Sequence, residues 1–355
     1  MRIIHVVRSL DPAMGGPTRS VKGLCRALSL SGVDVTLWVL NGSHEFVNPC
    51  RVEVVYGGCP DFQKYDLAHV HGIWAIENHK AVKACIAAGL TYVISPRGML
   101  DPWSLSVKKW KKKLAMLVYQ RRDLNRASAF HATAKEESDH IRQLGFRQPI
   151  IIASNGVEIP CVMPEKTWGD PVYNHTAIFL SRLHPGKGLL TLAEAWARVR
   201  PIGWRMLVVG PDSYGHKNDV VERINQLGIA RDWQFVGGLD DEKKWVAYRS
   251  ADLLIHPSVS ENFGITIAEG LAAGLPVIAT KGTPWSDLET RGCGWWIDVG
   301  VTPLEVALRK AIDASDATRH DMGERGKELV SEKYTWEAVA RKMISGYEEV
   351  LNAKS

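Results

Sequence analysis

Short apolar runs alternate with longer amphipathic segments along most of this chain, and the alternation predicts strands and helices in turn. In the first half, β-rich runs predict strands at residues 3–7, 35–40, 52–56, 67–70, 91–95 and 149–154. The second half repeats the pattern, with strands predicted at residues 175–181, 204–210, 233–237, 252–257 and 275–280. Because the runs are apolar on both faces and helices separate them, each half predicts a doubly wound parallel α/β sheet.

The segment between the two sets of strands has a different composition. Residues 155–174, NGVEIPCVMPEKTWGDPVYN, contain three prolines and two glycines, which is typical of a linker. We therefore expect a Rossmann-like domain at residues 1–158, a linker at 159–174 and a second Rossmann-like domain at 175–333. The amphipathic C-terminal helix, 334–355, has no strand after it and is expected to cross back to the first domain.

Composition places the chain among globular proteins. Of its 355 residues, 45% are hydrophobic and 23% are charged, which excludes disordered and fibrous classes. The net charge of +5 is too small and too diffuse to indicate a nucleic-acid partner. The six cysteines form no C-x-x-C pair, so they predict no metal site. Neither a signal peptide nor a run of ~18 apolar residues is visible, so we expect a cytoplasmic protein.

The stretch HPSVSENFGITIAEGLAAGLPVIAT, residues 256–280, carries the most chemical information. A strand ends in a polar loop and a helix follows, and ligands of open α/β sheets bind at such carboxyl ends. Backbone N–H groups at the helix start, around Phe263, suit a phosphate, whereas the Glu269 carboxylate suits the two hydroxyls of a ribose. The alternative is that Glu261 is only a charge favoured near a helix start and Glu269 a solvated helix residue.

Residues 181–189, SRLHPGKGL, follow a predicted strand and offer two cations. The Arg182 guanidinium can bind two phosphate oxygens and the Lys187 ammonium can add a point charge, so the pair suits a diphosphate. The G-x-x-x-x-G-K-[ST] string of a P-loop is absent, which argues against hydrolysis of ATP or GTP. The alternative is an ordinary strand-to-helix turn with two surface charges.

Two features of the first half can face a ligand at the end of a strand. Gly15, Gly16 and Pro17 open a helix after the first strand, and backbone without side chains can approach a ligand closely. His69 and His71 end the fourth strand, where a histidine is positioned for a ligand, although a lone histidine is more often structural. The G-x-G-x-x-G fingerprint is missing, which weakens the case for a dehydrogenase.

In this order, the motifs resemble the glycosyltransferases of family 4 over nearly the whole chain. The resemblance rests on the glycine loop, SPRGML at 95–100, SNGV at 154–157, SRLHPGKG and the final helix. Its most specific part is the E-x7-E from Glu261 to Glu269 with the intervening NFG. The resemblance implies the GT-B fold, in which two Rossmann-like domains face a central cleft, and a reaction that retains the anomeric configuration.

The resemblance also implies roles for individual residues. The Arg182 and Lys187 positions bind the donor diphosphate in this family, while Glu261 holds the donor sugar and His71 lines its anomeric side; these four are the expected catalytic residues. The expected donor-binding residues are Gly16, Arg182, Lys187, Asn262, Phe263, Gly264, Ile265 and Glu269, and Arg97 is expected on the acceptor side. The loop TKGTPWSDLE, which contains Lys281 and Trp285, departs from the family pattern of glycines and a glutamate.

A basic amphipathic segment lies at residues 103–122. Its apolar residues, among them Trp110 and Leu117, fall at helical spacing, and five lysines and two arginines crowd the same segment. Such helices suit anionic membrane surfaces, so one expectation is a peripheral contact with the inner face of the plasma membrane. The alternative is a helix that packs its apolar stripe on the sheet and leaves its lysines in water.

Together these observations predict a retaining hexosyltransferase in polysaccharide biosynthesis. The donor would be a nucleotide diphosphate sugar, UDP-glucose or another UDP-hexose, and the acceptor a glycan or a lipid-linked molecule. No D-x-D motif occurs, so neither a metal nor another cofactor is expected. A UDP-sugar epimerase and a non-catalytic UDP-sugar-binding protein are the alternatives; the first would need no acceptor and the second would show no turnover.

Overall fold

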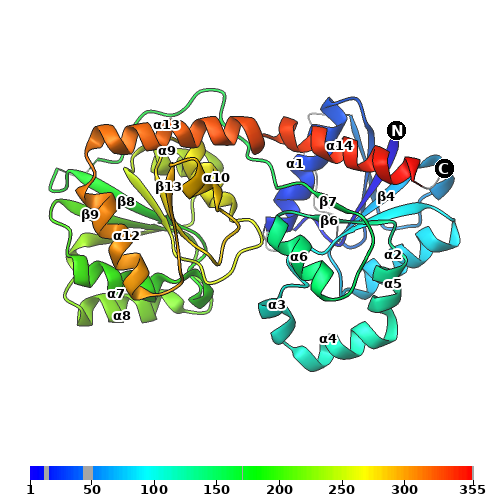
Figure 1. Cartoon of the computed structure of the whole chain (residues 1–355), viewed down its shortest axis with the longest axis horizontal. Helices are drawn as coiled ribbons and strands as arrows, with labels where there is room; N and C mark the ends of the chain where they lie inside the picture. Colours follow the sequence, from blue (N-terminus) through cyan, green and yellow to red (C-terminus); the bar gives the residue numbers. More distant parts are fainter. Residues whose placement is uncertain (12–15, 43–50, 170, 354–355) are drawn as a thin grey trace. The chain divides into compact units, whose positions relative to one another are not determined.

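Two units, each with its own sheet, make up this protein (Figure 1). The computed structural model describes residues 1–11, 16–42, 51–169 and 171–353. One unit comprises Met1–Glu158 together with Tyr334–Ser355, and the other comprises Ile159–Lys333. The C-terminal helix therefore belongs to the same unit as the N-terminal half of the chain.

The first unit is built on a parallel sheet that has seven strands within the described residues, in the order β3-β2-β1-β4-β5-β6-β7. These are β1 (Arg2–Val7), β2 (Asp34–Val39), β3 (Val52–Tyr56), β4 (Leu67–His71), β5 (Thr91–Ser95), β6 (Ala129–Ala132) and β7 (Ile150–Ile152). The strand order runs outward in both directions from β1 and β4, as in a doubly wound sheet. The carboxyl ends of β1 and β4 therefore lie at the topological switch point, where ligands of such sheets bind.

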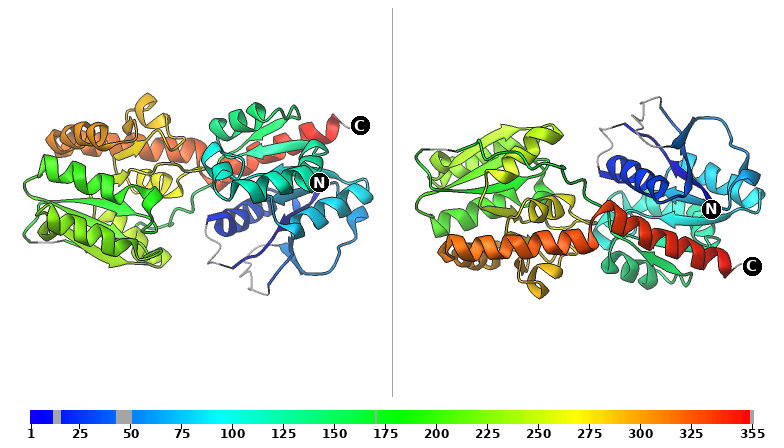
Figure 2. Two further views of the ribbon diagram at one scale, coloured as in Figure 1. Left: turned by 90° about the horizontal axis from the view of Figure 1, so that it is seen from below. Right: turned by 90° about the horizontal axis from the view of Figure 1, so that it is seen from above.

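Helices cover both faces of this sheet, as the views in Figures 1 and 2 show. Residues of α1 and α14 share one core with the sheet, and residues of α2, α5 and α6 share the other. The helices are α1 (Gly16–Leu30), α2 (Ile76–Ala87), α3 (Pro102–Ser106), α4 (Lys109–Ala115), α5 (Arg121–Asn125), α6 (Lys135–Gln143) and α14 (Trp336–Asn352), with a 3-10 turn at Phe62–Lys64 and a π turn at Met116–Gln120.

The second unit has a parallel sheet of six strands within the described residues, in the order β10-β9-β8-β11-β12-β13. They are β8 (His175–Leu180), β9 (Trp204–Val209), β10 (Trp233–Gly237), β11 (Leu253–His256), β12 (Val277–Thr280) and β13 (Gly294–Ile297). The helices are α7 (Leu189–Val199), α8 (His216–Gln226), α9 (Asp241–Arg249), α10 (Ile265–Ala272), α11 (Asp287–Thr290), α12 (Val301–Asp313) and α13 (Asp316–Lys333), with 3-10 turns at Pro185–Lys187 and Ala230–Asp232.

The apolar runs predicted every strand except two, with boundaries within two residues of the observed ones. The strands that the sequence pattern missed are β6 and β13, whose sequences are AFHA and GWWI. Each has four residues, and alanine, histidine or glycine takes the place of the β-branched residues that mark the other strands. Their pairing with β5 and β12 in the sheet makes them strands.

The second half of the predicted linker already packs on the second unit. The side chain of Arg205, which is buried, donates to the carbonyl of Trp168 at 2.7 Å, and the Trp168 N–H donates to the Ser250 hydroxyl at 3.1 Å. These contacts place residue 168 on the second sheet, seven positions before the predicted start of that domain. A buried guanidinium needs acceptors, and the backbone of this segment supplies one.

The basic segment at 103–122 packs Leu105 and Met116 against the core of the first unit, but its predicted apolar stripe is exposed, so the alternative interpretation is wrong for that stripe. The chain there forms α3, α4, the π turn and the start of α5. Trp110 is 82% exposed and Leu117 is 84% exposed. Trp103, Val107, Leu114 and Val118 are exposed as well.

Close packing of α13 on the turn after α10 generates a prediction about stability. A Cβ at position 323 would lie 2.0 Å from the carbonyl oxygen of Gly274. Gly323→Ala is therefore expected to lower the free energy of unfolding by about 1–3 kcal/mol, although alanine is the better helix former. Urea unfolding measures this change. The control is Ser331→Ala at an exposed position of the same helix, for which we expect less than about 0.5 kcal/mol; equal stability of the two variants would contradict the packing.

Candidate active site

Two loops of the second unit meet at the carboxyl edge of its sheet. The loop after β8 carries Lys187, and the loop after β11 carries Glu261. The Val259 N–H donates to the Gly186 carbonyl at 2.9 Å, and the Ser258 hydroxyl donates to the same carbonyl at 3.1 Å. Because β8 and β11 are neighbours in a parallel sheet, their ends deliver both loops to one place.

Glu261 is the centre of a hydrogen-bonded cluster. Its Oε1 atom accepts from the Lys187 ammonium, from His256 Nε2 at 2.9 Å and from the Ser258 hydroxyl at 3.1 Å. Burial by itself raises the pKa of the Glu261 carboxyl, but the hydrogen bonds and charges of His256 and Lys187 outweigh burial and hold the pKa at about 2. Glu261 is thus a carboxylate at any ordinary pH.

The two predicted diphosphate-binding cations are in different states. Lys187 is partly buried and already paired with Glu261, so a diphosphate would have to compete with Glu261 for it. Arg182 is exposed, and within the described part of the chain it makes no hydrogen bond or ion pair. An anionic ligand can therefore recruit Arg182 without breaking an existing contact.

The second glutamate of the E-x7-E, Glu269, lies on α10 and is buried. Lys244 Nζ lies 2.7 Å from its Oε1 atom, and the Tyr248 hydroxyl donates to its Oε2 atom at 2.9 Å. This residue is not the solvated helix position that the alternative interpretation proposed. Each carboxylate oxygen can accept more than one hydrogen bond, so Glu269 keeps capacity for hydroxyl donors.

A tryptophan shapes the loop between the two glutamates. The indole Nε1 of Trp285, which is fully buried, donates to the Phe263 carbonyl at 2.5 Å, and the two rings lie 5.3 Å apart. Gly264 has a φ of 80° and stands immediately before the first residue of α10, Ile265. The Trp285 loop departs from the family pattern, and its tryptophan holds Phe263 in place through this hydrogen bond and ring contact.

In the first unit, His71 ends β4 and contacts Arg97. The Arg97 guanidinium donates through one terminal nitrogen to His71 Nδ1 at 3.0 Å and through the other to Ser20 Oγ at 3.0 Å and Asn155 Oδ1 at 2.9 Å. All three acceptors are neutral groups. Burial first, and then the Arg97 charge, hold the pKa of His71 well below its ordinary value, so the ring is neutral.

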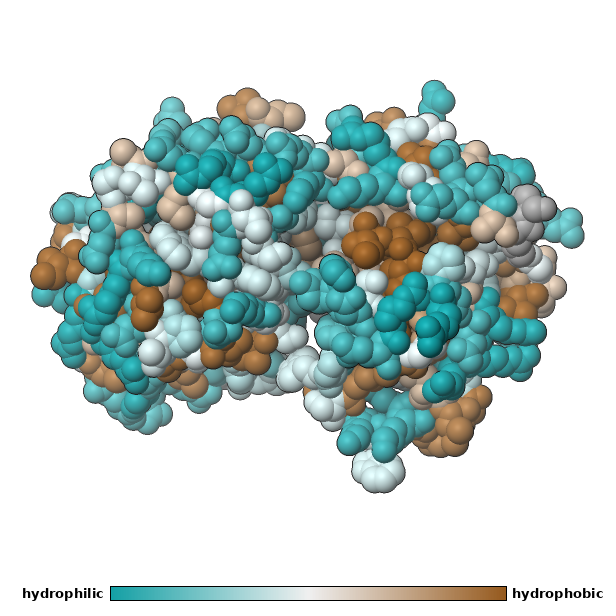
Figure 3. Space-filling view, viewed as in Figure 1, coloured by the Kyte–Doolittle hydropathy of each residue, from teal (hydrophilic) through white to brown (hydrophobic). Residues whose placement is uncertain are grey.

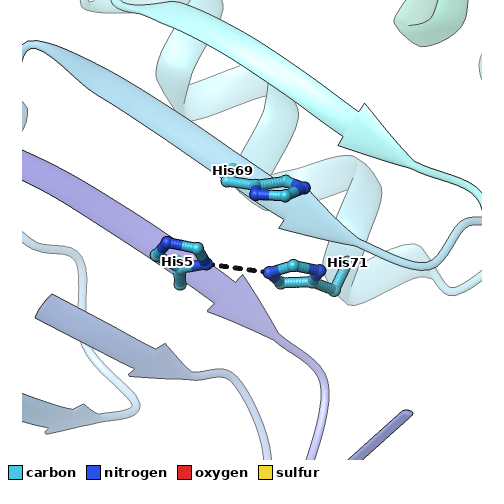
Figure 4. A group of neighbouring side chains, drawn as sticks. All are labelled: His5, His69 and His71. Atoms are coloured by element: carbon cyan, nitrogen blue, oxygen red, sulfur yellow. Dashed lines mark hydrogen bonds between the residues drawn. The ribbon is translucent and has the colours of Figure 1, made fainter. Parts of the chain in front are cut away.

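Four buried histidines form two hydrogen-bonded chains whose tautomers are determined by their ends. His71 accepts from Arg97 at Nδ1, so its Nε2–H donates to His5 Nδ1 at 2.9 Å (Figure 4). In the other chain, His131 Nε2–H donates to the Ala153 carbonyl at 2.8 Å, so its Nδ1 accepts from His69 Nε2–H at 3.3 Å. His69 Nδ1 must then accept from the Tyr347 hydroxyl, at 2.6 Å. The second chain ties α14 to the sheet.

The ring nitrogens of His5, His69 and His71 lie within 4.8 Å of one another, the spacing of a three-histidine metal site. Two features of the cluster oppose a metal. The hydrogen-bonded chains already occupy nitrogen lone pairs, and the Arg97 guanidinium lies against His71. A divalent cation would be repelled by that charge, so these residues do not fit one.

His71 and Arg97 line a pocket of about 430 Å³ at the carboxyl ends of β1 and β4. The start of α1 contributes Thr18 to its wall, and the loop after β4 contributes Ile73 and Trp74. Gly16 begins α1, whereas Gly15 lies outside the described residues. The pocket belongs wholly to the first unit.

Known families match both halves of the chain. A model described as "Glycosyl transferases group 1" matches residues 168–329, and one described as "Glycosyl transferase 4-like domain" matches residues 61–156. The first covers the Lys187 and Glu261 cluster, and the second covers His71 and Arg97. This chain is a GT-B glycosyltransferase of the family 4 type.

Individual relatives of this glycosyltransferase are distant. It is 24% identical to a GDP-mannose:cellobiosyl-diphosphopolyprenol alpha-mannosyltransferase of Komagataeibacter xylinus, over 99% of this chain and 94% of that protein. It is 29% identical to a lipopolysaccharide 1,2-N-acetylglucosaminetransferase of Salmonella typhimurium, over 46% of each. The chain thus spans about half of the latter relative. The crystal structure of Anabaena HepE with UDP-glucose has a TM-score of 0.75 and 19% identity, covering 98% of this chain and 100% of that one.

The fold places the predicted residues in three groups. Lys187 and Glu261 contact each other, Glu269 has separate partners in the same unit, and His71 contacts Arg97 in the first unit. Sequence reasoning missed the side chains that hold the glutamates: His256, Ser258, Lys244 and Tyr248. The spacing of Lys244 and Tyr248, four residues apart on one helix, was the only signal available for that pair.

The charge of Glu261 generates a pH prediction. Its pKa falls from 4.5 in the unfolded chain to about 2 in the fold, so it stabilises the fold above pH ~4.5, and the contribution is lost as the pH falls through 2. Glu261→Gln is expected to lower the free energy of unfolding by about 3 kcal/mol at pH 7, and by less at each step below pH 4.5.

Urea unfolding at pH 7, 5 and 3.5 measures the difference between the two proteins. Glu165→Gln, at an exposed position of the same unit, is the matched control and should show no such pH dependence. A difference between wild type and Glu261→Gln that stays constant down to pH 3.5 would contradict the lowered pKa.

Proposed function

We propose that this glycosyltransferase is a retaining hexosyltransferase that uses a UDP-hexose, such as UDP-glucose, and a glycan or lipid-linked acceptor in polysaccharide biosynthesis. The observation that carries the proposal is the pair of glutamates in the second unit, Glu261 partly buried and Glu269 buried, with the Lys187 ammonium bonded to the first of them. This arrangement offers a cation for the diphosphate, a carboxylate for the sugar and a carboxylate for the ribose.

The names of related proteins support the donor and acceptor classes. The Komagataeibacter relative acts from GDP-mannose on a diphosphopolyprenol-linked sugar, and the HepE fold holds UDP-glucose. The choice between uridine and guanosine is the finer part of the proposal, and a comparison of UDP with GDP tests it.

The second unit would act by stabilising the leaving group. As the bond between the anomeric carbon and the diphosphate oxygen breaks, negative charge grows on the diphosphate, and Arg182, Lys187 and the N–H groups at the start of α10 would face that charge. Lys187 would exchange Glu261 for the diphosphate, which frees the carboxylate for the hydroxyls of the donor sugar. The departing phosphate would take the proton of the acceptor hydroxyl, so no side chain is assigned as the base. We propose no metal or other cofactor for this step.

Replacing the two cations tests the donor site. Arg182→Ala is expected to weaken UDP binding by about 10- to 150-fold without changing the melting temperature, because the Arg182 side chain makes no hydrogen bond or ion pair in the described part of the free protein. Lys187→Ala should weaken UDP binding similarly and also lower the melting temperature, because it leaves Glu261 with one cationic partner fewer. Calorimetry with UDP and with GDP, and thermal melts, provide the measurements.

The control is Lys166→Ala, which removes an exposed cation of the same unit. Unchanged UDP affinity in both Arg182→Ala and Lys187→Ala would refute the proposal that these residues bind the diphosphate.

Product analysis with and without an acceptor extract separates a transferase from an epimerase, and the absence of any turnover would indicate a binding protein.

We also propose that the basic segment 103–122 docks the protein on an anionic membrane. The segment, residues 103–122, has five lysines and two arginines and no acidic residue, and its exposed apolar side chains include two tryptophans. Basic and apolar side chains gather at the edge where α4 lies (Figures 1 and 3). No helix in the described part of the chain is both long and apolar enough to cross a bilayer. Surface binding through exposed lysines and tryptophans needs no spanning helix.

Charge reversal tests this surface. Changing Lys109, Lys111 and Lys113 to Glu is expected to reduce sedimentation with anionic vesicles by about a hundredfold or more at low salt, since each surface lysine contributes roughly 1 kcal/mol. Lys112 is left in place because its ammonium also donates to the Ser104 hydroxyl.

Reversal of Lys80 and Lys83, two exposed lysines of α2, is the control and should have little effect. UDP binding should be unchanged in both variants. Wild-type protein that fails to sediment with anionic vesicles at low salt would refute the membrane contact.

A further inference from the structure

The pocket at the carboxyl ends of β1 and β4 is lined by cationic and apolar side chains. Its residues include two arginines, Arg8 and Arg97, and no carboxylate. Arg8 Nε lies 3.8 Å from the carboxylate of Glu77, which is not a lining residue, so Arg97 is the main cation of the pocket. Apolar side chains make up much of the rest, among them Ile73, Trp74 and Met99. A cavity with cations and an apolar wall suits a ligand that carries both an anionic group and an apolar group.

Arg97 is nine-tenths buried and has no anionic partner within the described residues. Its terminal nitrogens donate to a histidine, a serine and an asparagine, and its Nε has no acceptor. The carboxylate of Glu137 acts on it through space, but the Glu137 oxygens accept from Gly98 N–H and from Thr133. A buried cation without a paired anion is costly, and a ligand can supply the missing charge.

His71 cannot neutralise the charge of the Arg97 guanidinium. Its Nδ1 lone pair accepts from Arg97 and its Nε2–H donates to His5, so both nitrogens are committed in the neutral ring. Protonation of His71 would place a second cation beside the guanidinium. The net charge of the pocket floor therefore stays positive.

Two helices, α1 and α2, begin at the pocket, and the start of α1 adds positive potential. Thr18, in the first turn of α1, lines the pocket, and that turn contains no acidic residue. Ala75, the N-cap residue of α2, lines it too and supplies no side-chain cap, although the Glu77 carboxylate in the first turn of α2 accepts from its own backbone N–H. Backbone N–H groups at helix starts favour anions, phosphate above all.

Trp74 connects the pocket to the basic segment 103–122. The Gln120 side chain accepts from the Trp74 N–H at 2.8 Å, the Tyr119 hydroxyl donates to the Trp74 carbonyl at 2.5 Å, and Lys112 Nζ lies 5.8 Å from the indole centroid. Trp74 has a φ of 73°, a conformation that tryptophan rarely adopts, and these contacts hold it. These contacts join the apolar wall of the pocket to the basic segment 103–122.

We propose that this pocket binds the phosphate or diphosphate group of the acceptor, with Arg97 as its main cationic partner and the apolar wall facing a lipid chain. The proposal rests on the proposed transferase function in identifying the ligand as the acceptor. The shared chemistry is a phosphate group, whether it is attached to a lipid or to a soluble sugar.

A matched pair of variants at Ala75 tests the site without disturbing the fold. Both Ala75→Asp and Ala75→Asn supply a favourable N-cap for α2, but only the aspartate adds a negative charge to the pocket lining. Calorimetry uses the full chain, saturated with UDP, and two probes: inorganic pyrophosphate and geranyl diphosphate. Ala75→Asp is expected to bind both probes at least about tenfold more weakly than Ala75→Asn, because of the repulsion between like charges.

Arg97→Gln is expected to lose most binding of both probes, and circular dichroism checks that it folds. Tighter binding of geranyl diphosphate than of pyrophosphate would support a lipid-linked source, and equal binding would support a soluble phosphate. Equal binding by Ala75→Asp and Ala75→Asn, or no binding of either probe by wild type, would overturn the site. UDP affinity of the wild type is measured first: if UDP does not bind, the proposed donor has failed, and the two probes are then titrated without UDP, so the phosphate site is still tested.

Discussion

The arrangement of charged side chains in the second unit depends on how closely three of its loops approach one another. A Cβ at position 188 would lie 2.1 Å from the Pro257 carbonyl oxygen, and one at position 282 would lie 2.2 Å from the Val259 carbonyl oxygen. Only glycine fits at such distances. The loops after β8, β11 and β12 are therefore packed backbone to backbone, and this contact brings Lys187 within hydrogen-bonding distance of Glu261.

This close contact has an electrostatic consequence. Glu261, His256 and Lys187 satisfy one another in the free protein, so the cluster is ordered before any ligand arrives. An anionic ligand that takes Lys187 would release a carboxylate oxygen at the same moment. In the proposed mechanism, the ion pair would support the loops in the free protein and would couple the binding of the phosphate and sugar parts of one ligand.

In the first unit, the main electrostatic feature is a group of buried histidines beside Arg97. Its sheet buries four histidines and an arginine near one another, and the hydrogen-bonded chains keep every ring neutral. Burial holds the pKa of His5 and of His131 at about 3, so no second charge accumulates beside Arg97. Arg97 remains without an anionic partner within the described residues, at the carboxyl ends of the strands, and this is the basis of the proposed anion site. The two units thus present cations at the carboxyl ends of their strands by different means.

The amino-acid sequence by itself determined the number and type of nearly all the strands, because apolar runs buried on both faces leave a signal that depends only on neighbouring residues. It also located Glu261, Glu269 and Lys187, since their motifs are local in the chain. The partners of these residues were beyond its reach: Lys244 lies 25 positions from Glu269, and Tyr347 lies 278 positions from His69. Likewise, helical spacing cannot reveal which face of a helix is covered, and only the tertiary structure left Trp110 and Leu117 exposed. Such contacts arise from the packing of distant segments, and packing is a property of the whole fold.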